Sequence, residues 1–86
     1  MSGVSQHTDA TAHLVRMANS IGEFFSAYPE RAEALEGIAT HIRKFWEPRM
    51  RRQLYAYLDG PAGGAQLSDL VREAAQARRG DLLPQT

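Results

Sequence analysis

Apolar residues recur every three or four positions through most of the chain, which is the spacing of amphipathic helices. The first such stretch predicts a helix over about residues 11–27, capped by Asp9 or Thr11. Gly22 lies on the flank of its apolar stripe, where a missing side chain would let a neighbouring helix approach closely. The residues of this stripe are Leu14, Met17, Ala18, Ile21, Phe24, Phe25 and Tyr28.

Pro29 ends this first helix and opens a second one, because proline suits the first position of a helix. The second helix is predicted to reach about Trp46, shortly before Pro48 forbids its continuation. His41 falls at the edge of its apolar face, near Phe45. That face consists of Leu35, Ile38, Ala39, Ile42, Phe45 and Trp46.

A third helix is predicted from Pro48 to about Leu58, and a glycine-rich break follows it. A short fourth helix begins with Ser68 as its cap and stops at Gly80. The apolar positions of the third helix are Met50, Leu54, Tyr57 and Leu58. Those of the fourth helix are Leu70, Val71, Ala74 and Ala75.

The predicted fold class is all-α: a small bundle of three to four short helices with loose termini. The predicted organisation is a flexible N-terminal tail at 1–10, a helical core domain at 11–59, a linker at 60–66, a short C-terminal helix at 67–80 and a tail at 81–86. We find no strand pattern and no repeat. With 86 residues, the chain is long enough for one small domain whose own core is marginal.

Residues 41–52 have the most distinctive composition in the sequence, because they contain the only tryptophan and several arginines close to Pro48. We expect a corner between two helices there, with Phe45, Trp46 and Met50 pointing inward. Aromatic residues and arginine together are typical of protein interfaces. The predicted partner-binding residues are Arg43, Trp46, Arg49, Arg51 and Arg52.

Composition narrows the possible chemistry. The formal net charge is zero, which argues against a general nucleic-acid binder, although Trp46 and the neighbouring arginines keep a small nucleic-acid-binding module open as an alternative. The chain has no cysteine, so it can form neither a disulfide nor an ordinary iron–sulfur site. It has no run of eighteen apolar residues, so no membrane span is expected.

Catalysis by this chain alone is not expected either. His7, His13 and His41 form no metal-binding pair, and no serine lies in a nucleophile motif. Glu30, Glu33 and Glu36 repeat every three residues, but such a row is ordinarily the solvated face of a helix. The sequence therefore predicts no catalytic residue, no bound metal and no cofactor in this chain.

Two blocks of sequence carry a family resemblance. Residues 14–25 read LVRMANSIGEFF and residues 41–51 read HIRKFWEPRMR, with Pro29 between them. Together they resemble the delta subunit of the cytoplasmic NAD-dependent formate dehydrogenases of bacteria, over about residues 14–58. Glu47 stands where an aspartate is expected, and aspartate would cap the following helix better.

The resemblance implies a complex whose alpha subunit carries a molybdenum or tungsten pterin and iron–sulfur clusters, and whose beta subunit carries flavin and the NAD site. The delta subunit binds no redox cofactor. We therefore expect a cytoplasmic, non-catalytic subunit that stabilises the catalytic alpha subunit or helps it mature, without nucleic acid or membrane as partner. An assembly chaperone that is absent from the mature enzyme is a further alternative.

Overall fold

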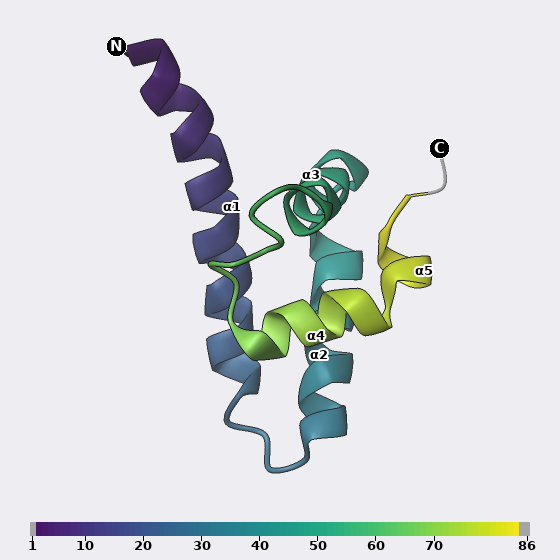
Figure 1. Ribbon diagram of the computed structural model, residues 1–86. Coiled ribbons are helices and arrows are strands. Elements are labelled where there is room, and N and C mark those ends of the chain that lie inside the picture. Colours follow the sequence, from purple (N-terminus) through teal and green to yellow (C-terminus); the bar gives the residue numbers. More distant parts are fainter. Residues whose placement is uncertain (1, 85–86) are drawn as a thin grey trace.

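The computed structural model describes residues 2–84, and their side chains from Ala10 onward. It contains five helices: α1 (Ser2–Phe25), α2 (Arg31–Phe45), α3 (Pro48–Asp59), α4 (Asp69–Ala77) and α5 (Arg79–Leu82). None of the described residues forms a strand, so the predicted all-α class is confirmed. α1 and α2 run antiparallel, and α4 lies across them (Figure 1). No helix in this part of the chain is long and apolar enough to cross a membrane.

The boundaries of α2, α3 and α4 lie within about three residues of their predicted positions. Pro48 opens α3, and the Ser68 side chain accepts a hydrogen bond from the Val71 amide at 3.3 Å as the predicted cap of α4. The predicted start of the first helix at Thr11 was wrong, because α1 already begins at Ser2. No proline interrupts residues 2–25, and extending an existing helix costs far less than nucleating one.

The C-terminal prediction also needs correction. Gly80 was predicted to end the fourth helix and residues 81–86 to form a tail, but α4 ends at Ala77 and Gly80 lies within α5. The reason is Leu82, whose side chain is fully buried against the core, so the chain folds back for one more helical turn. Residues 85–86 lie outside the described part.

One hydrophobic core joins all five helices, with a few small residues where helices approach most closely. Three large side chains that the sequence placed in apolar stripes are exposed: Phe24 by 67%, Tyr28 by 42% and Phe45 by 70%. Phe24 and Phe45 lie at the edges of their stripes, and Tyr28 lies beyond the end of α1. Val15, Ala34 and Tyr55 are buried instead. The core consists of Leu14, Val15, Ala18, Ala34, Ile38, Ala39, Ile42, Trp46, Leu54, Tyr55, Leu58, Leu67, Val71, Ala74, Ala75 and Leu82.

α4 approaches α1 closely at Gly22, as the sequence predicted. A Cβ atom at Gly22 would lie 2.5 Å from Cγ2 of Val71 and 3.2 Å from the Ser68 hydroxyl oxygen. Asn19, one turn earlier, holds the start of α4 in place: its side chain donates to the Gln66 carbonyl at 2.9 Å and accepts from the Ser68 amide at 2.8 Å.

Replacement of Gly22 by alanine should therefore destabilise the fold by about 1–3 kcal/mol through overpacking, despite the better helix propensity of alanine. Gly80→Ala is the matched control, because a Cβ there meets nothing within 4 Å. Urea unfolding of both variants and of Gly22→Ala combined with Val71→Ala measures the effect. Recovery of stability in the double variant is expected; equal stability of the single Gly22 variant and the wild type would contradict the close approach.

Tyr55 links α3 to the end of α4. Its ring is 1% exposed, and its hydroxyl donates to the Ala75 carbonyl at 2.7 Å, one of the last four carbonyls of α4 that have no partner within the helix. The guanidinium of Arg79 lies 4.8 Å from the ring centre and also pairs with Asp59. Burial raises the pKa of Tyr55 to about 12, and the nearby Arg79 opposes this change.

This raised pKa makes folding sensitive to alkali. Because the folded pKa lies above the ordinary value of 10.0, the neutral hydroxyl contributes its full stability below pH 10, and this contribution is lost as pH rises toward 12. Unfolding followed by circular dichroism at pH 8 to 12 should show this loss. Tyr55→Phe should be less stable at pH 8, by about 0.5–1.5 kcal/mol, and should lack the part of the alkaline loss that comes from Tyr55. An unchanged pH profile in this variant would contradict the assignment.

Candidate partner-binding site

The corner between α2 and α3 is held by its own backbone. Trp46 is only 4% exposed, and its amide donates to the Ile42 carbonyl at 2.9 Å as the C-cap of α2. The half-buried Arg51 donates to two carbonyl groups, those of Trp46 and Leu82, both at 3.1 Å. These contacts give Trp46 and Arg51 roles inside the fold. A contact of these two residues with a partner remains a prediction, and burial leaves little of the Trp46 side chain for such a contact.

The other predicted partner-binding residues lie on the surface. Arg43 near the end of α2, and Arg49 and Arg52 in the first turns of α3, have exposed side chains. Met50 lies between the last two along the chain and is partly buried against the core, as predicted. The structure therefore places Arg43, Arg49 and Arg52 at the surface as predicted contacts, and Arg52 already interacts within the fold. The buried Trp46 does not join them in an exposed patch.

A second feature, which the sequence did not predict as a site, lies along the outer side of α2. We call it the aromatic groove: an open depression of about 770 Å³ between α2 and the end of α1. The sequence signal for it was present in the aromatic residues near the two helix ends, but these were assigned to the core. Its apolar part is formed by Phe25, Tyr28, Ala32, Gly37, His41 and Phe45.

The aromatic rings of the groove, together with the neighbouring Phe24, which does not line the groove, form a continuous row. Phe25 is at the centre: its ring centroid lies 4.9 Å from that of Phe24 in an edge-to-face arrangement, 5.3 Å from Tyr28 and 6.5 Å from His41. His41 in turn lies 4.7 Å from Phe45, which confirms the predicted neighbourhood of these two residues. Edge-to-face and tilted contacts between Phe and Tyr rings are favourable beyond the burial of area, so they help to order the row.

Gly37 allows this arrangement. A Cβ atom at Gly37 would lie 2.4 Å from two carbon atoms of the Phe25 ring. The ring therefore rests directly on the α2 backbone, and any side chain at this position would push it away. Gly37 was not singled out from the sequence, since a glycine within a helix has no visible partner until the neighbouring chain is placed.

Charged side chains border the groove. Glu36 forms an ion pair with Arg78, which follows α4. Glu33 and Lys44 lie on the same face of α2, about three helical turns apart. Glu33 lies in the first turn of α2 and Lys44 in the last, where each also complements the helix dipole.

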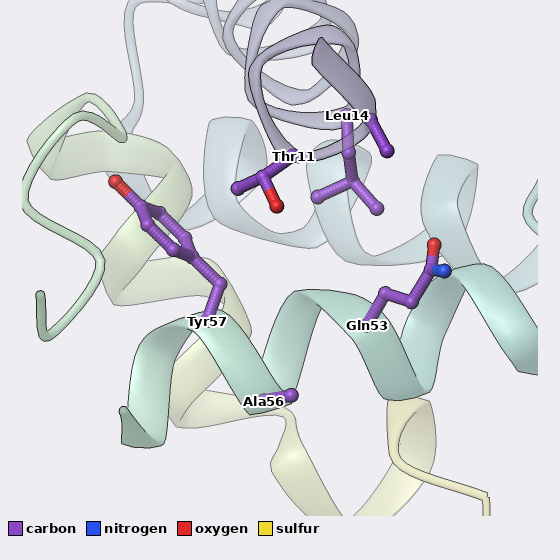
Figure 2. A pocket seen from close by; sticks show the side chains of 6 residues that line it. Thr11, Leu14, Gln53, Ala56 and Tyr57 are labelled. Carbon is purple, nitrogen blue, oxygen red and sulfur yellow. The ribbon is translucent and has the colours of Figure 1, made fainter. Parts of the chain in front are cut away.

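A smaller hollow of about 300 Å³ lies between α1 and α3. Figure 2 shows Thr11 and Leu14 of α1 facing α3, which contributes Gln53, Ala56 and Tyr57. The Tyr57 hydroxyl oxygen accepts a hydrogen bond from the backbone amide of Gln66 at 2.9 Å. The hollow brings together no charged side chain, and among the described residues no three His, Asp or Glu side chains come together as metal ligands would.

The fold and its surface thus define a small helical protein whose most prominent exposed feature suits contact with another macromolecule. The family model described as NADH-dependent formate dehydrogenase delta subunit (FdsD) matches residues 13–75, and the chain belongs to this family. The matched region contains α2, α3, most of α4 and the part of α1 that bears the core. No curated protein and no solved structure gives a significant match.

The adjacent residues Phe45 and Trp46 should respond very differently to truncation. Trp46→Ala should cost about 3–5 kcal/mol of folding free energy, because its side chain is buried. Phe45→Ala should change stability by only about 0.5 kcal/mol, because its ring is 70% exposed. Thermal and urea unfolding of the two variants test this difference. A large loss in the Phe45 variant would mean that this ring belongs to the core.

Proposed function

We propose that this chain is a non-catalytic accessory subunit of an NAD-dependent formate dehydrogenase complex, which binds the catalytic alpha subunit and stabilises it or helps it mature. Membership of the delta-subunit family supports the assignment to the complex. The observation that carries the binding role is the exposed aromatic row, in which Phe24 is 67% and Phe45 70% exposed although the chain buries a continuous core elsewhere.

The energetics of this surface favour a macromolecular partner. Complete burial of a phenylalanine side chain contributes about 1.5–3 kcal/mol, so two exposed rings offer several kcal/mol to a protein that covers them. The Phe25 ring also loses little conformational freedom on binding, because it is already held against Gly37 and Phe24. A small core combined with an ordered apolar surface is the arrangement expected of a subunit that works in contact with another chain.

The redox chemistry of the proposed complex belongs to its other subunits. The alpha subunit would carry the molybdenum or tungsten pterin and iron–sulfur clusters, and the beta subunit the flavin and the NAD site. This chain would supply contact surface in the cytoplasm. A subunit that binds only the native alpha chain stabilises it by RT ln(1 + [L]/Kd), about 2.7 kcal/mol at a hundredfold excess over Kd.

Co-expression of the alpha subunit with and without this chain tests the proposal. With the chain present, we expect co-purification at constant stoichiometry, a higher Tm of the alpha subunit and a larger fraction of it loaded with molybdenum. Both preparations are compared by thermal unfolding and by metal analysis. Equal Tm and equal loading, with no co-purification, would refute the proposed role.

The same preparations separate the two alternatives. A chain that raises molybdenum loading but is absent from the active enzyme is an assembly chaperone. Salt-sensitive binding of DNA or RNA by the isolated chain, without any effect on the alpha subunit, would favour a nucleic-acid-binding module.

A further inference from the structure

The aromatic groove follows α2 from Ala32 to Phe45, a length of about 20 Å at the rise of an α-helix. The small residues Gly37 and Thr40 line it, and the Phe25 ring lies against the Gly37 backbone. By helical spacing, the rings of His41 and Phe45 lie to one side of these two residues, and Glu36, which pairs with Arg78, lies to the other. This is a long, shallow channel with an apolar wall, and such channels bind the apolar stripe of a helix.

The ends of the groove carry opposite charges. Glu33 marks the end near the start of α2, and Lys44 marks the end near Trp46. Neither of the two forms an ion pair with another described residue, in contrast to Glu36. Both are exposed, so their effect on a partner is mainly one of selection and orientation.

These charges favour one direction of the bound helix. Helices commonly carry acidic residues in the first turn and basic residues in the last, because these complement the helix dipole. A helix that lies antiparallel to α2 brings its acidic first turn to Lys44 and its basic last turn to Glu33. A parallel helix would bring like charges together at both ends.

We infer that the aromatic groove binds an amphipathic helix of about three turns from the catalytic subunit, antiparallel to α2, with an acidic residue opposite Lys44 and a basic residue opposite Glu33. Apolar side chains spaced three and four positions apart along this helix pack onto Phe25, His41 and Phe45. The inference rests on the proposed function, since it names the contact surface of the accessory subunit. It assigns the main contact to the groove and not to the arginines of the corner.

The first test measures binding to the co-expressed alpha subunit by titration. Phe45→Ala and Lys44→Glu should each weaken binding, the former about tenfold or more, as expected for a central aromatic contact. Arg49→Glu is the matched control, because it reverses an exposed charge on α3 outside the groove. Circular dichroism melting of all three variants confirms that they are folded.

The second test locates the bound segment. The photoreactive residue p-benzoylphenylalanine is placed at position 45 or position 49, and cross-linked peptides are identified by mass spectrometry. Position 45 should link to a helical segment of the alpha subunit, close to its acidic first turn. A link from position 45 to a second copy of this chain, or to a non-helical segment, would overturn the inference.

The outcomes separate this inference from the proposed function. If the wild-type chain does not bind the alpha subunit, the proposed function fails. If the wild-type chain binds and the Phe45 and Lys44 variants bind equally well, the groove is not the contact and only the inference fails. Loss of binding in the Arg49 variant alone would show that the contact lies at the corner between α2 and α3, and the inference would fail.

Discussion

The close crossing of α4 over α1 and α2 is the constraint on which the structure depends. Val71, Ala74 and Ala75 are completely buried at this crossing, and Gly22 lets the Val71 side chain reach the α1 backbone. Small residues bring helix axes close together and so increase dispersion contacts, which matters in a chain with little core to offer. Most of the remaining features follow from the position that α4 takes.

One consequence is the division of α2 into two different faces. Ile38 and Ile42 point into the core that α4 and α1 cover, and both are completely buried. Gly37 and Lys44 lie on the other face, which no helix among residues 2–84 covers, and there the Phe25 ring at the end of α1 lies against the Gly37 backbone. The aromatic groove therefore lies on the face of α2 that α4 does not cover.

Local sequence signals predicted the helices well, because each of them acts over a single turn. Pro48 and Ser68 marked helix starts that the structure confirms, and Gly22 marked a close approach. The spacing of apolar residues predicted burial less well at the edges of the stripes: it assigned Phe45 to the core although its ring is 70% exposed. A stripe gives the direction in which a helix is apolar, but the neighbouring helices decide how much of its width is covered.

The choice of partner-binding residues from the sequence has the same limit, because it also depends on how the helices pack. Arginine and tryptophan lie together in residues 41–52 of the sequence, and this composition is typical of an interface. In the fold, Trp46 turns into the core and Arg51 binds the Trp46 and Leu82 carbonyls, so these residues tie α2, α3 and α5 together. The aromatic groove joins residues from two helices and the turn between them, and a pattern read along one helix cannot reveal it.

The corner and the groove are nevertheless physically connected. Trp46 and Phe45 are neighbours at the end of α2, so burial of the Trp46 indole fixes the direction in which Phe45 projects. The Arg51 contact to the Trp46 carbonyl holds the chain at this point, where an unsupported helix end would fray. Residues 41–52 thus support the proposed partner surface mainly by orienting Phe45, while Trp46 and Arg51 make their contacts within the fold.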